Sequence, residues 1–260
     1  MSRGLQWIHA LAQGPEVAGF PASVKVIDGE LDNRPARFIA VVPDPHNPFP
    51  RARQGEVGVL EGWGLAKAVE QAIEADQGGQ PRVLVAVVDV PSQAYGRREE
   101  ALGIHQALAG AVDAYARARL AGHPLLGLLV GKAMSGAFLA HGYQAQRLIA
   151  LDDPGVMVHA MGKAAAARIT LRSVEELEAL AAKVPPMAYD LANYASLGLL
   201  WERVPVAAIE QPGEAEAASV REVLSRALRD IGDSRDLRGR LGASNRALSS
   251  QVRERLRAQW

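Results

Sequence analysis

The residues that could do chemistry gather in one stretch, GKAMSGAFLAHG, at residues 131–142. An apolar run at residues 124–130 precedes it and predicts a buried strand, and the segment after Gly136 has the composition of a short helix. A strand that leads into a helix leaves several backbone N–H groups unpaired at the helix start. Such a turn either binds an anion or lets a strand and a helix pack closely, and the residues alone favour neither.

Two side chains in this stretch suggest other chemistry, but neither has the sequence context that it needs. A serine nucleophile on a strand-to-helix turn requires Gly-x-Ser-x-Gly, and Ala133 and Ala137 occupy the glycine positions around Ser135. Lys132 lies outside the Gly-x-x-x-x-Gly-Lys-Ser/Thr frame that holds nucleotide phosphates, and no Gly-x-Gly-x-x-Gly follows a predicted strand. We therefore expect Ser135 to act as a backbone donor or a helix cap.

A second strand-to-helix transition, DVPSQAYGRRE, lies at residues 89–99. Adjacent parallel strands of one sheet would place both turns at the same edge. N–H groups that converge from two such turns can stabilise an oxyanion as it develops. The alternative is that Gly131 and Gly136 only permit tight packing of strand against helix.

The histidines show no pattern typical of a metal site. They are His9, His46, His105, His123, His141 and His159. They are scattered, without the His-x-x-x-His or carboxylate spacing that forms a set of ligands, so no metal is expected. His159 differs from the others because it follows a predicted strand near the glycine-rich turn, and we take it as a candidate for substrate contact.

Composition excludes several classes of function. The chain has 260 residues, of which 29 are basic and 29 acidic, so no overall charge points to nucleic-acid binding. It has no cysteine, which excludes disulfides and cysteine nucleophiles. No apolar segment of about 20 residues predicts a membrane span or signal peptide, and a soluble cytoplasmic protein is expected.

The order of the elements predicts one α/β domain over residues 1–260. Strands are expected at residues 23–31, 37–43, 82–90, 124–130, 147–153 and 156–162, and helices at 61–77, 101–120, 173–183, 191–204 and 215–231. The first two strands form a hairpin around a turn at residues 32–35, and a βαβαβ order follows that is typical of a parallel sheet.

The C-terminal third is expected to be helical and to form an interface from about residue 170. Ser173 and Glu176 form a capping-box signature at the start of one helix. Residues 244–260 are arginine-rich with helical spacing, and an arm that lies across a partner is expected there. Its exposed apolar residues would be Leu248, Val252, Leu256 and Trp260.

These motifs, taken in order, resemble the crotonase superfamily in its acyl-thioester carboxyltransferase branch. Its glycine-rich oxyanion turn is similar to GKAMSGAFLAHG, and EGWGLAKAVEQA, VLVAVVDVPSQAYGRREEALG and RLIALDDPGVMVHAMGKAAA resemble segments of acetyl-CoA carboxyltransferase alpha subunits. PDPHNPFPRARQGEVGVLEGWGLA and the chain length are similar, more narrowly, to gamma subunits of biotin-independent malonate decarboxylase. The resemblance implies a crotonase-like ββα spiral with a helical C-terminal region.

The resemblance also implies an activity and partners. The implied activity is that of a carboxy-lyase, which converts malonyl thioester on an acyl carrier protein to acetyl thioester and CO2 through an enolate. The implied partners are a beta subunit of the same fold, the carrier protein and an alpha acyl-carrier transferase subunit. The substrate would be carried on a CoA-like prosthetic group, and no biotin, metal, nicotinamide, nucleic acid or membrane is implied.

Position by position, the resemblance places the oxyanion turn at Met134, Ser135 and Gly136. The second turn contributes Ser92 and Gln93, because proline at the preceding position cannot donate. Carboxyltransferases have consecutive glycines in the first turn, so the side chains of Met134 and Ala137 are expected to narrow the substrate space. Further loop residues are expected to contact the substrate, the carrier protein or the phosphates of its prosthetic group. The alternative is that they form ordinary solvated surface. These residues are Arg51, Arg53, Tyr95, Arg97 and Arg98.

Two alternatives remain open at this point. The chain could be a carboxyltransferase alpha subunit that moves a carboxyl group from carboxybiotin to an acyl-CoA. It could also be a non-catalytic assembly subunit that supports a beta subunit. The resemblance also leaves open which subunit supplies the principal oxyanion hole.

Overall fold

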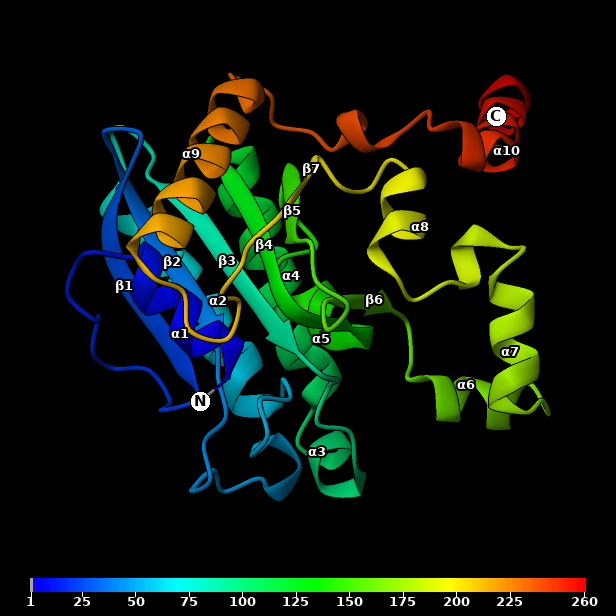
Figure 1. The fold of residues 1–260 in the computed structure, drawn as a ribbon. Coiled ribbons are helices and arrows are strands. Elements are labelled where there is room, and N and C mark those ends of the chain that lie inside the picture. The colour runs from blue at the N-terminus through cyan, green and yellow to red at the C-terminus, as the bar shows by residue number, and fades with distance from the viewer. Residues whose placement is uncertain (1) are drawn as a thin grey trace.

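The computed structural model describes residues 2–260, and a twisted seven-stranded sheet forms its centre (Figure 1). Along the main path the strands follow the order β1-β2-β3-β4-β5-β7, and β6 pairs with β4 beside that path. Their bounds are β1 Val24–Leu31, β2 Arg34–Val41, β3 Val83–Val90, β4 Leu125–Met134, β5 Arg147–Leu151, β6 Met157–His159 and β7 Glu202–Val204. The β1–β2 pair is antiparallel and the other pairs are parallel, as predicted.

Ten α-helices surround this sheet in the described part of the chain. They are α1 Arg3–Leu11, α2 Val59–Ala75, α3 Arg97–Ala101, α4 Ile104–Leu120, α5 Ser135–Ala140, α6 Lys163–Ile169, α7 Val174–Ala181, α8 Leu191–Ser196, α9 Glu214–Ile231 and α10 Ala247–Gln259. Helices α2 and α4 pack together on one face of the sheet, and α1 and α9 cover the other (Figure 1). No helix among residues 2–260 is long and apolar enough to cross a membrane.

The sheet interior follows from the sequence of its strands. Residues of β3 and β4 are almost all buried, because helices cover both faces, and continuous runs of valine and leucine suit strands in that position. The β1–β2 hairpin turns at Asp32 and Asn33, which have φ of 52° and 59°. A turn with two positive φ values matches the twist of the strands and favours Asn and Asp. The predicted turn at 32–35 is thus shorter, since β2 begins at Arg34.

The sequence prediction differs from the fold at both ends of the chain. The helix expected at residues 191–204 ends at Ser196, and Glu202–Val204 forms strand β7 against β5. Residues 202–204 form a strand because they pair with β5. Three residues are too few to show the alternation of apolar and polar side chains by which a strand is predicted from sequence. The sequence did not predict helices α1 and α6. Helix α1 nevertheless belongs to the core, because its Trp7 is fully buried.

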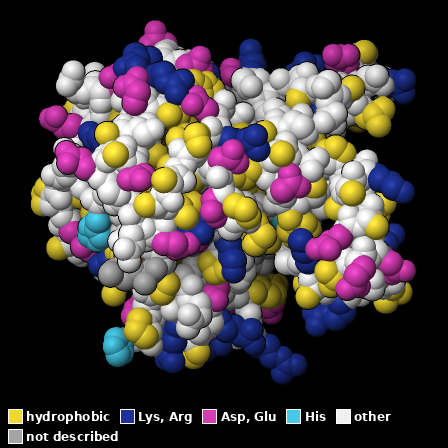
Figure 2. All heavy atoms as spheres, in the orientation of Figure 1, with side chains coloured by type: hydrophobic (Ala, Val, Ile, Leu, Met, Phe, Trp, Pro, Cys, Tyr) yellow, Lys and Arg dark blue, Asp and Glu magenta, His cyan; other side chains and the backbone are white. Residues whose placement is uncertain are grey.

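Helices α6, α7, α8 and α10 project from the sheet to one side, as two arms in Figure 1. Helix α7 begins with the predicted capping box, in which the Glu176 N–H donates to Ser173 and Glu176 accepts from the Ser173 N–H. Helix α10 has no buried residue. On the face drawn in Figure 2, basic and acidic side chains are interspersed, as the balanced composition leads one to expect.

Candidate active site at a strand-to-helix junction

Strand β4 runs directly into helix α5 without the loop that the sequence suggested. Residues 131–134 belong to the strand, and Lys132–Met134 pairs with β6 through Met157–His159. Helix α5 then starts at Ser135, which has φ of 61°. This left-handed conformation is uncommon for a residue with a Cβ and costs about 1–2 kcal/mol, so the junction is sharp and strained.

Gly131 serves close packing. A Cβ built on Gly131 would lie 2.1 Å from Oδ1 of Asp89, a residue of the neighbouring strand β3. The Asp89 carboxylate in turn accepts hydrogen bonds from the N–H groups of Lys132 and Gly4, each at 3.2 Å. Of the two roles considered for this glycine, tight packing is therefore the one that the structure shows.

The two turns lie side by side, as expected from adjacent parallel strands. The N–H of Gly136 donates to the side-chain Oε1 of Gln93 at 3.1 Å. In this structure the Gly136 donor is thus occupied by the Gln93 side chain, so the second turn presents a side-chain acceptor to the first. The Ser92 carbonyl accepts a hydrogen bond from the Val57 N–H at 3.1 Å, which fixes the second turn against the residues that precede α2.

A cavity of about 470 Å³ opens beside the junction. It brings together Ser135, Gly136 and His159, three of the residues singled out in the sequence. The rest of the lining is mostly apolar: Phe138, Leu139, Tyr143, Val158, Ala160, Pro185, Pro186, Ala188, Tyr194, Leu197 and Leu199. An apolar lining of this kind would limit the water around a ligand held near the turn.

Met134 and Ala137 do not line this cavity. Met134 packs into a separate buried cluster with Ala166, Leu177 and Tyr189, and only 5% of it is exposed. Ala137 is fully buried in the main core. Neither side chain therefore narrows this cavity, and Ala137 offers no exposed surface to it. Both side chains point into the protein. They lie on opposite sides of the sharp turn at Ser135, so they pack into two different hydrophobic clusters.

His159 forms part of the cavity wall at the end of β6. Its Nδ1 lies 3.1 Å from the carbonyl oxygen and 3.3 Å from the amide nitrogen of Met161. Its ring stacks on Tyr189 with centroids 3.9 Å apart and planes 12° apart. Burial lowers the pKa of His159, and contacts with the backbones of Met161 and Met187 only partly oppose this. The imidazole is therefore neutral at pH 7.

Tyr95, Arg97 and Arg98 lie at the surface around α3 and do not line the cavity. Tyr95 is 56% exposed. The Arg98 guanidinium lies 5.0 Å from the centroid of the Phe49 ring and donates to the Pro48 carbonyl at 3.4 Å. All three residues are exposed, and α3, which begins at Arg97, lies below α5 in the view of Figure 1.

Sequence analysis missed the residues that close the cavity from the opposite side. Tyr143 lies just after α5. Tyr194 belongs to α8, and Leu197 and Leu199 follow that helix. Tyr194 lies about 60 positions after Ser135 in the chain, and nothing in its local sequence distinguishes it from an ordinary core tyrosine. In residues 2–260 we find no group of three or more His, Cys, Asp or Glu side chains that could hold a metal ion.

Comparison with known proteins places this chain in a family. The family model of the malonate decarboxylase gamma subunit matches residues 52–260. A chain of a Pseudomonas malonate decarboxylase hetero-tetramer in complex with coenzyme A is 73% identical, with both chains covered completely and a TM-score of 0.96. A chain of the Pseudomonas MdcD-MdcE hetero-dimer is 70% identical with a TM-score of 0.92, again over 100% of both chains.

More distant relatives agree on the fold. The malonyl-S-ACP:biotin-protein carboxyltransferase of Malonomonas rubra is 36% identical over 160 residues, which are 60% of this chain and 55% of that protein. The chain thus spans about half the length of this curated relative. Transcarboxylase 12S is 19% identical, with a TM-score of 0.65 over 86% of this chain and 40% of that one, and it confirms the predicted carboxyltransferase-type, crotonase-like fold. By the match to its family model, the chain belongs to the family of malonate decarboxylase gamma subunits.

Proposed function

We propose that this chain is one subunit of a heteromeric decarboxylase that releases CO2 from malonyl thioester on an acyl carrier protein. The family membership supports this, as do the complexes in which the two Pseudomonas relatives were solved. The immediate partner would be a beta-type subunit of the same fold, as in the MdcD-MdcE hetero-dimer. The carrier protein and an alpha acyl-carrier transferase subunit would complete a cytoplasmic complex.

One observation carries the chemical part of the proposal: the Gly136 N–H, beside the cavity, already donates to a carbonyl oxygen, that of the Gln93 side chain. A thioester carbonyl could take the same place. When the bond between the α-carbon and the carboxylate breaks, CO2 leaves and the electron pair moves to the thioester oxygen. A donor aimed at that oxygen is typically worth about 3–4 kcal/mol in the transition state.

The other lining residues would assist in two ways. Apolar walls from Leu139, Val158 and Leu199 would keep water from the departing carboxylate. The α-carbon of the enolate must then take up a proton, from water or from a positioned donor. His159 is our candidate for substrate contact here, because it lies in the same wall as Ser135.

A substitution at Gly136 tests whether this subunit supplies the oxyanion donor. Gly136→Pro removes the N–H, whereas Gly136→Ala keeps it, and the nearest neighbour of the added Cβ would be Oε1 of Gln93 at 3.5 Å. We expect the assembled complex with proline to lose at least about 100-fold in kcat, and the alanine variant to stay within about threefold. Unchanged turnover in an intact proline-variant complex would move the oxyanion hole to the partner, or make this chain a supporting subunit.

The Malonomonas relative favours a second candidate, carboxyl transfer to a biotin protein. The two functions separate in one assay. The decarboxylase releases CO2 from malonyl carrier protein without biotin, whereas the carboxyltransferase transfers the carboxyl group only when biotin or a biotinylated protein is added. An enzyme that needs biotin for turnover would replace the first proposal with the second.

The surface around α3 is proposed as a carrier contact. Tyr95, Arg97 and Arg98 are available there to an acidic carrier surface or a phosphate. The double variant Arg97→Glu, Arg98→Glu should raise the KM for malonyl carrier protein and leave that for a small malonyl thioester unchanged. Equal KM values in wild type and variant for the carrier substrate would assign these arginines to ordinary surface.

A further inference from the structure

Arg240 is an unusual cation because it is buried and its donors are only partly used. Only 7% of it is exposed. Its Nη1 donates to the Tyr143 carbonyl at 2.9 Å, and its Cζ lies 5.3 Å from the centroid of the Tyr143 ring. Its Nε and Nη2 are buried without any hydrogen-bond partner.

The charge of Arg240 is also uncompensated. Among the described residues no carboxylate forms an ion pair with it, and Arg119 and Arg147 add further positive charge around it. Burial lowers the pKa of Arg240; Tyr194 and Tyr143 oppose this shift, and the two arginines add to it. A buried charge is normally paired, because removing it from water without a partner is costly. An anion near Arg240 would therefore supply the negative charge that this buried guanidinium lacks.

The residues next to Arg240 belong to the wall of the candidate active site. Tyr143, on which the guanidinium packs, and Tyr194 both line the cavity that holds Ser135 and His159. Tyr194 is 9% exposed, and its hydroxyl has no hydrogen-bond partner either. An unpaired cation thus contacts a tyrosine of the cavity wall without lining the cavity itself.

We propose that Arg240 is a positioning residue whose uncompensated charge draws the free carboxylate of the substrate into the cavity, acting through the wall formed by Tyr143 and Tyr194. This rests on the proposed function, which supplies a substrate with such a carboxylate. Charges separated by a protein wall still interact appreciably, since the protein interior and the aromatic rings screen less than water does. The negative charge stays in the cavity during the reaction, so substrate and transition state benefit alike and the effect falls on KM.

Substitution of Arg240 in the assembled complex tests the proposal. Arg240→Met removes the charge and keeps much of the stem, and should raise the KM for malonyl thioester about tenfold with kcat within about twofold. A tenfold change corresponds to about 1.4 kcal/mol. Arg240→Lys keeps the charge but loses the planar fork, and should restore KM to within about threefold of wild type. Arg34→Met is the matched control, because Arg34 also has a buried Nε without a partner and does not line this cavity.

A binding measurement separates this proposal from the proposed function. Malonate and the neutral malonamide are titrated into the complex without carrier protein. Wild type and Arg240→Lys should prefer malonate, and Arg240→Met should lose about tenfold of that preference. An unchanged preference in Arg240→Met, or equal losses in the Met and Lys variants, would overturn the proposal. A complex that releases no CO2 but keeps an Arg240-dependent preference would instead refute the proposed function alone.

Discussion

The side-chain oxygen of Gln93 lies 3.1 Å from the amide nitrogen of Gly136, and this hydrogen bond joins the two strand-to-helix turns at one edge of the sheet. It does two things at once. It gives a partner to a donor in the first turn of α5, and it places a carbonyl oxygen where the proposed reaction would place the substrate's oxygen. The resting site is therefore filled by the protein itself.

Removal of the Gln93 side chain should affect stability and substrate binding in opposite directions. Gln93→Ala leaves the Gly136 N–H without its acceptor, so the free energy of unfolding should fall by about 1 kcal/mol. The same change removes a competitor of the thioester oxygen, and KM should fall several-fold. Thermal unfolding and steady-state decarboxylation measure the two effects. A rise in KM would show that Gln93 contacts the substrate instead of competing with it.

Close packing at Gly131 predicts a marked loss of stability for Gly131→Ala. The new Cβ would meet the Asp89 carboxylate at 2.1 Å, and overpacking of this kind costs about 1–3 kcal/mol. Urea unfolding measures the difference. Gly162→Ala is the matched control, because no atom lies within 4 Å of a Cβ built there. Equal stabilities of the two variants would contradict the packing role of Gly131.

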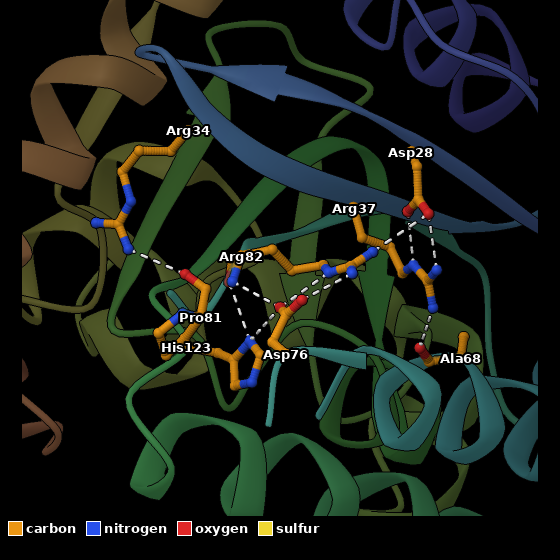
Figure 3. A network of polar contacts seen from close by, with 8 residues as sticks. All are labelled: Asp28, Arg34, Arg37, Ala68, Asp76, Pro81, Arg82 and His123. Atoms are coloured by element: carbon orange, nitrogen blue, oxygen red, sulfur yellow. Dashed lines mark hydrogen bonds and ion pairs between the residues drawn. The ribbon is translucent and has the colours of Figure 1, made fainter. Parts of the chain in front are cut away.

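The ion network at the other end of β3 should make stability depend on Asp76 (Figure 3). Arg82 donates to Asp76 through two nitrogens, at 2.9 and 2.8 Å, and also contacts Asp28 at 3.2 Å. Burial would raise the pKa of Asp76, but the hydrogen bonds and charge of Arg82 outweigh it and hold that pKa below its ordinary value. Asp76→Asn should therefore lower the free energy of unfolding at pH 7 by about 2 kcal/mol.

The pH dependence of this difference follows from the sign of the shift. A carboxyl group with a lowered pKa in the folded state stabilises the protein fully above its unfolded pKa of about 3.9. The stabilisation is lost as the pH falls through the folded pKa. Wild type and Asp76→Asn should therefore converge in urea unfolding as the pH falls from 5 to 3. Asp113→Asn, which breaks an exposed pair with Arg117, should change stability by less than about 0.5 kcal/mol.

Buried His141 should destabilise the protein in mild acid. Its Nε2 lies 3.0 Å from the Val87 carbonyl and its Nδ1 3.1 Å from the Tyr115 hydroxyl, and burial lowers its pKa to about 4. The unfolded state binds a proton near pH 6.5 while the folded state does not, so stability falls as the pH drops from 6.5 toward 4. About 2 kcal/mol should be lost between pH 7 and pH 5.

Replacement of this histidine isolates that contribution. His141→Gln should be less stable at pH 7, because the buried hydrogen bonds to Val87 and Tyr115 must rearrange, but it lacks the titrating group. Urea unfolding at several pH values should therefore show a flatter profile for the variant than for wild type between pH 7 and pH 5. Parallel profiles would assign the acid sensitivity to other residues.

Helix α10 should be needed for assembly and dispensable for folding. Its apolar stripe, Leu248, Val252 and Leu256, is 78%, 57% and 58% exposed. Replacing these three residues with serine should leave thermal unfolding of the isolated chain unchanged, because no residue of α10 is buried. Co-purification with the beta-type partner should be lost, whereas Ser250→Ala on the same helix should not affect it. Retained co-purification of the triple variant would remove α10 from the interface.

Several elements could be predicted because their causes are local. The Asp32-Asn33 turn, the apolar run of β3 and the Ser173–Glu176 capping box each depend on neighbours within a few residues. Where a distant strand or helix supplies the reason, prediction failed. Strand β7 exists because it pairs with β5, and β4 continues to Met134 because β6 lies beside its last residues.

The sequence by itself determined the opening hairpin, the alternation of strands and helices from β3 to β5, the parallel sheet, and the strand-to-helix turn at Ser135 and Gly136. Only the tertiary structure decided how that turn is used. It turned Met134 and Ala137 inward, gave the Gly136 donor to Gln93, and closed the cavity with Tyr194 from α8. The reason is physical: periodicity and capping are set by residues a few positions apart, whereas the contacts of a site are set by packing between segments far apart in the chain.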